Sequence, residues 1–181
     1  MNQATQAQET TREQLRDGSH DFDFLRGCYR VHNVRLADWL DQASRWQTFE
    51  AISIATPMPR GSGWIDELLA DNRADYAGST LRLYDPRTRC WSLYRSGSES
   101  DMRQQPLQGS FRDGIGIFEG CDEVERQSLR VRIVWSQVTA ASARCEQAFS
   151  RDRGATWQPN WIMQYTRLGD PVRSLHAPLA R

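Results

Sequence analysis

Short segments of alternating polar and apolar residues fill the chain from about residue 20 to residue 167, and turn signals separate them. These signals recur about every 8–12 residues, as in many β domains. Two are explicit: "DPRTR" within Ser79–Gly97, and Asp113-Gly114 within Leu107–Gly120. No stretch has the period of a long amphipathic helix. The pattern predicts an all-β chain in which successive strands pair antiparallel.

The number of strand candidates, roughly nine or ten, constrains how the sheet ends. A meander of this length without covering helices leaves two open edges, and closure removes both. We therefore predict a single antiparallel barrel of about eight to ten strands, with a β-sandwich as the alternative. His20–Gly27 precedes the first strand and predicts a short turn that plugs one barrel end. The predicted domain spans 20–168, between a flexible segment 1–19 and an irregular tail 169–181.

Charge and cysteine content exclude several function classes. Arginine and lysine total 23 and so do the acidic residues, and every basic residue is arginine, so Schiff-base chemistry is excluded. The balance predicts no nucleic-acid or membrane partner. The start lacks a signal-peptide core, which predicts a cytoplasmic protein. No metal-binding spacing is present, and free thiols are expected at four positions: Cys28, Cys90, Cys121 and Cys145.

Ser150–Trp157, "SRDRGATW", fits the Asp-box pattern of sialidases and other propeller proteins. Ser150 and Asp152 can bond backbone amides across a tight turn, and Gly154 can adopt positive φ. A propeller would repeat this box in every blade, whereas this chain has one copy and no internal repeat. The box therefore predicts a structural hairpin and not a glycosidase.

Polar residues on the apolar faces of alternating strands are the candidate site, because burying an unpaired polar group is costly. Closure of the sheet should bring these faces together around one lumen, where the arginines would favour an anionic or carbonyl-bearing head. The alternative is that they reach solvent at strand ends or form structural pairs. Aromatic residues on the same faces are either cavity wall or core packing. The polar candidates are Asn33, Arg35, Glu50, Arg95, Glu119 and Gln147, and the aromatic ones are Trp91, Trp135, Trp161 and Tyr165.

The order of several segments resembles a family of small bacterial domains of unknown function. The segments include "HDFDFLRGCYRVHNVRL", "LRLYDPRTRCWSLY" and "ARCEQAFSRDRGATWQPNWIMQYTR", and the resemblance covers roughly residues 20–167. Those domains are similar to calycins, the barrel superfamily of lipocalins and fatty-acid-binding proteins. Lipocalin-like first strands carry Gly-x-Trp, whereas this chain has Gly27-Cys28-Tyr29. The related haem-binding nitrobindins use a glycine-rich first strand and a late histidine, a pattern that this chain does not match.

The resemblance and the candidate residues together predict a binding protein that holds an apolar or aromatic small molecule with a polar head. No cofactor and no metal are expected, and a homodimer is left open. The alternative is a cofactor-free cyclase or isomerase acting on a natural-product or aromatic intermediate, with Glu50, Glu119 or Tyr29 as the acid or base. A third hypothesis is a structural partner protein whose barrel is filled by its own side chains.

Overall fold

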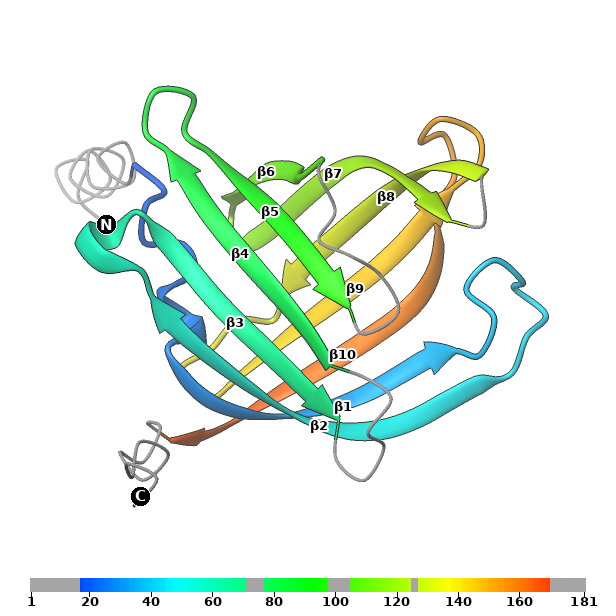
Figure 1. Cartoon of the computed structure of the whole chain (residues 1–181), viewed down its shortest axis with the longest axis horizontal. Coiled ribbons are helices and arrows are strands. Elements are labelled where there is room, and N and C mark those ends of the chain that lie inside the picture. Colours follow the sequence, from blue (N-terminus) through cyan, green and yellow to red (C-terminus); the bar gives the residue numbers. More distant parts are fainter. Residues whose placement is uncertain (1–16, 71–76, 98–104, 125–126, 170–181) are drawn as a thin grey trace, which may run out of the picture.

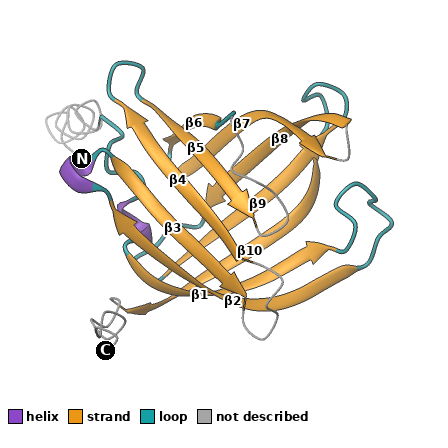
Figure 2. Ribbon diagram, in the orientation of Figure 1, coloured by secondary structure: helices purple, strands orange, loops and turns teal. Residues whose placement is uncertain are grey.

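The chain folds into one closed antiparallel barrel, which confirms the fold predicted from the sequence (Figures 1 and 2). The computed structural model describes residues 17–70, 77–97, 105–124 and 127–169, so most of the predicted terminal segments 1–19 and 169–181 lies outside the described residues. Each strand pairs with the next in sequence, and the last pairs with the first. The strands are β1 (Gly27–Leu36), β2 (Trp46–Pro57), β3 (Gly63–Ala70), β4 (Ala77–Asp85), β5 (Cys90–Gly97), β6 (Leu107–Arg112), β7 (Ile115–Val124), β8 (Gln127–Ser136), β9 (Ser142–Ser150) and β10 (Gln158–Gly169).

A short 3₁₀ turn, η1 (Asp23–Leu25), closes one end of the barrel, where the sequence predicted a plug. Phe22, fully buried just before this turn, packs edge-on against Trp91 with ring centroids 5.0 Å apart and also contacts Phe118 at 5.4 Å. The indole Nε1 of Trp91 donates a hydrogen bond to the Gly18 carbonyl at 3.0 Å. This aromatic cluster fixes the N-terminal segment under the barrel.

Tyr29, on β1, belongs to this closed end. Its hydroxyl donates to the carbonyl of Phe24 in the plug and accepts a 3.2 Å hydrogen bond from Arg167 on β10. Its ring is 1 % exposed and lies 6.0 Å from that of Tyr165. Tyr29 therefore joins plug, first strand and last strand.

Two strands face the opposite way from the sequence expectation. On β2 the small residues Ala51, Ser53 and Ala55 are buried inside, whereas Glu50 lies on the outer face. On β7 the isoleucines Ile115 and Ile117 are 46 % and 45 % exposed, and Gly116 and Phe118 face inward. The physical reason is space: a Cβ on Gly116 would lie 2.6 Å from the Phe111 ring. At this position the Phe111 ring fills the space that a side chain would need.

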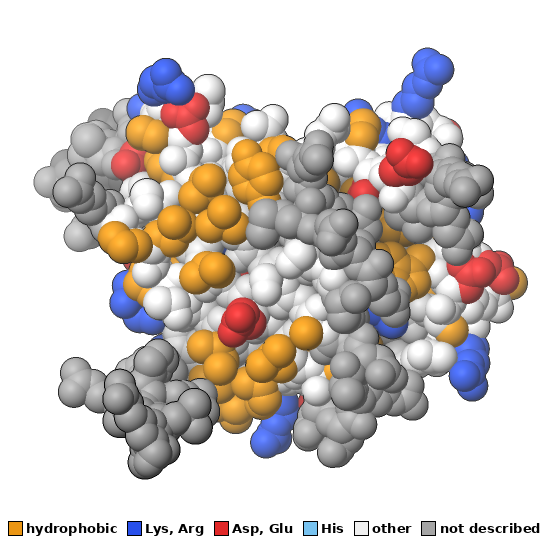
Figure 3. All heavy atoms as spheres, viewed as in Figure 1, with side chains coloured by type: hydrophobic (Ala, Val, Ile, Leu, Met, Phe, Trp, Pro, Cys, Tyr) orange, Lys and Arg blue, Asp and Glu red, His pale blue; other side chains and the backbone are white. Residues whose placement is uncertain are grey.

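Apolar side chains on the outside of the barrel are not confined to β7. Ile65 and Leu69 on β3 are 47 % and 46 % exposed. Figure 3 shows apolar side chains gathered on the outer face over β3 and β4. Their presence explains why an apolar-inward rule assigns strand faces incorrectly in this chain.

The Asp-box forms the β9–β10 hairpin turn. Ser150 Oγ donates to Asp152 Oδ1 at 2.7 Å and accepts from the Gly154 amide at 2.7 Å. The other end of the turn is held by Thr156, whose amide and hydroxyl both donate to the Asp152 carboxylate, at 2.9 and 2.6 Å. Gly154 has a φ of 98°, which explains the glycine there. These contacts support the expected structural role of the box.

Replacing Asp152 with alanine is expected to lower the melting temperature by a few degrees and to leave any ligand binding unchanged. The hydrogen bonds from Thr156 and Ser150 hold the pKa of Asp152 well below its ordinary value of 3.8. A carboxylate with a lowered pKa in the folded state stabilises the fold above its unfolded pKa, and this contribution is lost as the pH falls below 3.8.

The measurement is thermal unfolding followed by circular dichroism from neutral to acidic pH. Asp152→Asn, which keeps one acceptor oxygen, should lose less stability than Asp152→Ala. Because it has no carboxylate to protonate at this position, its melting temperature should fall less than that of the parent when the pH is lowered. A variant that melts like the parent while losing ligand binding would show that the box is a functional site.

Candidate functional site

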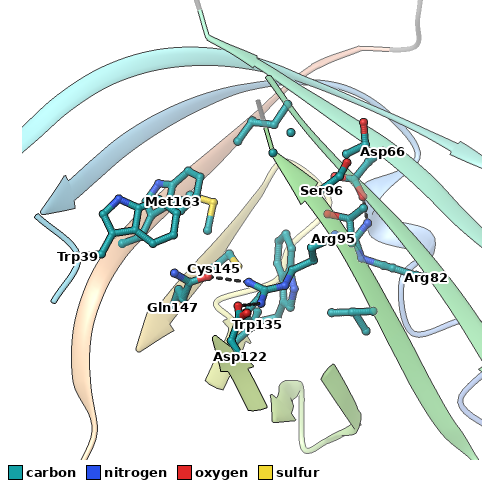
Figure 4. Close-up of a pocket in the computed structure, with 18 of the residues that line it drawn as sticks. Trp39, Asp66, Arg82, Arg95, Ser96, Asp122, Trp135, Cys145, Gln147 and Met163 are labelled. Carbon is teal, nitrogen blue, oxygen red and sulfur yellow. Dashed lines mark hydrogen bonds and ion pairs between the residues drawn. The ribbon is translucent and has the colours of Figure 1, made fainter. Parts of the chain in front are cut away.

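A cavity of about 700 Å³ lies inside the barrel and reaches the end opposite the plug. Residues 37–40 of the β1–β2 loop line its mouth, together with the strand termini at Gly78, Gly97 and Glu123. Figure 4 shows the interior with an aromatic side around Trp39 and Met163 and a polar side around Arg95 and Asp122. The cavity therefore offers different chemistry on its two walls.

Aromatic rings supply much of the first wall. Trp39 from the β1–β2 loop lies 6.1 Å from Trp161 of β10, measured between ring centroids. The indole of Trp161 is also held by a hydrogen bond, in which its Nε1 donates to Oδ1 of the fully buried Asn33 at 2.9 Å. The Arg35 guanidinium lies 5.2 Å from the Trp39 ring and 5.4 Å from the Trp161 ring, at cation–π distance. This wall presents flat aromatic surfaces and suits a flat apolar body.

Arg95 organises the second wall from β5. Its guanidinium donates to Gln147 Oε1 on β9 at 2.7 Å and contacts Asp122 Oδ2 on β7 at 3.4 Å (Figure 4). Gln147 in turn donates from Nε2 to Asn160 Oδ1 at 3.1 Å. The Arg95 side chain is 19 % exposed and that of Asp122 7 %. Three strands thus place a guanidinium, a carboxamide and a carboxylate at one side of the cavity.

A second ion pair lies deeper, between Arg82 on β4 and Asp66 on β3, with side chains 4 % and 7 % exposed. The guanidinium lies 4.9 Å from the Phe22 ring and 5.8 Å from the Trp135 ring. Burial lowers the pKa of Arg82 to about 10, so the group stays protonated at neutral pH. This pair lines the cavity next to the aromatic cluster around Phe22.

Sequence reasoning missed Asp66, Arg82 and Asp122. The sequence did contain a signal for Asp66, because this polar residue shares one face of β3 with the apolar residues Trp64 and Leu68. For Asp122 the signal was inverted, because β7 was expected to face the other way. Arg82 gave no such signal, because it lies between the outward-facing Leu81 and Leu83 and does not interrupt an apolar face.

The structure brings some predicted site residues together and separates others. Of the six polar candidates only Arg95 and Gln147 line the cavity, so the expected convergence is not found. Glu50 and Glu119 point outward because β2 and β7 face the other way. Glu50 lies outside with its Oε1 2.5 Å from Nδ1 of His32, and Glu119 lies outside with hydrogen bonds from Arg130 and Arg132 at 2.9 and 2.7 Å. Arg95, Gln147, Trp135, Trp161 and Tyr165 line the cavity, Asn33 and Arg35 lie behind its aromatic wall, and Trp91 and Tyr29 belong to the plugged end.

The cysteines differ sharply in accessibility, and all four are free. Cys121 is exposed on the outer face of β7, whereas Cys145 is buried and lines the cavity. Burial raises the pKa of the Cys145 thiol to about 12, so its reactive thiolate is scarce at neutral pH.

Iodoacetamide is therefore expected to alkylate Cys121 first and Cys145 last in the folded protein. Peptide mass spectrometry of a time course would rank the four sites, and a sample in urea, where all four should react, is the control. Alkylation of Cys145 as rapid as that of Cys121 would contradict the buried position.

None of the helices among the described residues is long and apolar enough to cross a membrane. Within the same described part of the chain, His, Cys, Asp and Glu side chains form no group of three or more that could hold a metal ion.

Comparison of the sequence with protein-family models and with curated proteins finds no match.

Proposed function

We propose that this protein binds a small molecule inside the barrel, with the ligand's apolar or aromatic body against Trp39, Trp161 and Met163 and its polar head at Arg95. The observation that carries the proposal is the cavity of about 700 Å³ with an aromatic wall and a polar wall. Pockets for small ligands commonly have volumes of about 300–1,000 Å³ and combine apolar lining with a few convergent polar groups.

The polar wall also argues against a barrel that merely fills itself. Ion pairs in a protein interior are often no more stabilising than apolar side chains of the same volume, because both charges lose hydration. A lumen needed only for packing would not require Arg95, Asp122 and Gln147 beside an open space. A ligand with a polar head gives these groups a use.

The barrel architecture supports the same proposal at the level of fold. A closed antiparallel barrel with a plug before its first strand is compatible with the calycin resemblance of the sequence. Calycin-like barrels hold their ligands in the lumen. We prefer binding to the cofactor-free enzyme, because its candidate acids and bases, Glu50, Glu119 and Tyr29, do not line the cavity.

The test is binding of the uncharged fluorophore Nile red, whose emission rises in apolar surroundings. Thr80 lines the cavity and lies opposite Arg95 in the β4–β5 register. Thr80→Trp should fill the space and weaken binding by about tenfold or more, equal to 1.4 kcal/mol. Leu81→Trp, one residue along the same strand but on the outer face, is the matched control and should bind like the parent.

Equal binding by the parent and both variants would place the dye outside the cavity and contradict the proposal. Circular dichroism of each variant checks that the barrel is intact.

A further inference from the structure

Asn33 is fully buried on the inner face of β1, in line with the large side chains of Tyr29 and Val31. Taking a carboxamide out of water costs free energy that an apolar side chain of the same size does not cost. Asn33 lies behind the aromatic wall of the cavity, where β1 pairs with β10. What it adds at this position is the pair of hydrogen bonds that its carboxamide makes.

The two hydrogen bonds of Asn33 have different roles. Nδ2 donates to the carbonyl of Val31 on the same strand at 2.9 Å, which holds the carboxamide against the β1 backbone. Oδ1 accepts a 2.9 Å hydrogen bond from Nε1 of Trp161 on β10. The backbone of one strand thereby sets the position of the indole on the next.

The hydrogen bond to Asn33 constrains the torsion of Trp161 that covalent geometry leaves loose. The χ2 torsion of tryptophan joins an sp³ carbon to an sp² carbon and has broad energy minima. Because Nε1 lies on the edge of the indole, tying it to Oδ1 selects one orientation of the ring. Trp39 and Phe49 contact the same ring at interplanar angles of 55° and 45°, and such tilted contacts have a weaker angular preference than a hydrogen bond.

The same hydrogen bond decides what Trp161 presents to a ligand. Nε1–H is the only hydrogen-bond donor of an indole, and Asn33 already accepts from it. Trp161 lines the cavity, so it contributes aromatic carbon there and no available N–H group. The part of a ligand that meets Trp161 is therefore recognised by ring contact alone.

We infer that Asn33 is a positioning residue for the ligand, which holds the Trp161 ring in the orientation that forms one side of the cavity. This role rests on the proposed function, and it adds that the ligand needs a flat apolar surface where it meets Trp161. Without Asn33 the indole N–H loses its buried acceptor. The ring then gains from turning its N–H toward the cavity, where water can accept from it, and the flat side of the cavity is lost.

A double-mutant cycle tests this role with Nile red as the probe. Asn33→Leu keeps the branched shape of the side chain and removes the acceptor, so it should weaken Nile red binding by about fivefold. Trp161→Phe keeps a ring and removes the N–H. Adding Asn33→Leu to Trp161→Phe should therefore change binding by less than about twofold. A general loosening of the barrel would instead weaken binding by the same factor with and without Trp161.

Near-ultraviolet circular dichroism provides a readout that needs no ligand. The band that Trp161 contributes is the difference between the parent and Trp161→Phe, and it should shrink in Asn33→Leu. Asn33→Asp keeps an acceptor oxygen at the same place and should retain more of the band than Asn33→Leu. The control is Ser53→Ala, which removes a polar side chain that is 2 % exposed on the adjacent strand β2 and should leave the band and Nile red binding unchanged.

The outcomes separate the positioning role from the function on which it rests. Urea unfolding checks that each variant is folded, and Asn33→Ala, which is smaller, replaces Asn33→Leu if the leucine does not fit. Nile red binding that is unchanged in Asn33→Leu, or weakened by the same factor with and without Trp161, would overturn the positioning role and leave the binding function in place. Failure of the parent to bind Nile red would overturn both.

Discussion

Replacing Asp66 with alanine is expected to lower the free energy of unfolding by about 3–5 kcal/mol, because it leaves a buried guanidinium without its carboxylate. Arg82 is 3 % exposed, so little water reaches the guanidinium to replace the lost partner. Equilibrium unfolding in urea, followed by tryptophan fluorescence, measures the loss.

Two further variants test the cause. Adding Arg82→Leu to Asp66→Ala removes the unpaired charge and should restore much of the lost stability. Glu119→Ala breaks the outer pairs to Arg130 and Arg132, where side chains are 28–38 % exposed, and should cost at most about 1 kcal/mol. If Asp66→Ala costs no more than Glu119→Ala, the Arg82–Asp66 pair does not hold the barrel together as described.

Phe22→Ala should cost a similar amount, about 3–5 kcal/mol, because it removes a fully buried ring and leaves a void in an aromatic cluster. Phe22 contacts the rings of Trp91, Phe111, Phe118 and Trp135 at centroid distances between 5.0 and 6.2 Å. The same urea titration measures the effect, and the change in near-ultraviolet circular dichroism reports the loosened tryptophans.

The neighbouring phenylalanine provides the control. Phe24 is only partly buried, so Phe24→Ala should cost clearly less than Phe22→Ala. Equal losses for the two variants would show that the plug is held by its backbone and not by the Phe22 ring.

The sequence predicted the architecture because several strands obey a simple rule, with large apolar side chains on the inner face and polar ones outside. On β8, Val131, Ile133 and Trp135 are buried and Arg130 and Arg132 face outward, as expected. The same holds for β9 and β10, which supply Gln147, Trp161 and Tyr165 to the cavity. Turn residues at Pro86 and Asp113-Gly114 marked two hairpins between strands.

The rule failed where the barrel is most crowded. On β2, Ala51 and Ser53 face inward and the isoleucines face out, and on β7 Gly116 faces inward against the Phe111 ring. Which strands meet rings depends on contacts between residues far apart in sequence, which a local pattern does not contain. Asp122 was missed for this reason, and Glu119 was placed inside in its stead.

The local sequence reveals less of the site than of the fold. Arg95 and Gln147 were found because each interrupts an apolar face, whereas Arg82 lies among outward-facing leucines and gave no such contrast. Its partner Asp66 comes from the preceding strand, and the register that joins them follows from the β3–β4 pairing. Ion pairs across strands are thus beyond a strand-by-strand analysis.

The pairing of β1 with β10, which closes the barrel, has a consequence for folding during synthesis. Hairpins between neighbouring strands can form as soon as each pair exists, but β1 has no partner on its second side until β10 is present. The Trp161–Asn33 hydrogen bond between these two strands joins residues 128 positions apart. At ordinary rates of synthesis that separation takes roughly ten seconds on the ribosome. During that interval the nascent chain presents an unpaired strand edge, the feature through which immature β proteins join one another. Completion of the last strand is therefore the step that removes the aggregation hazard.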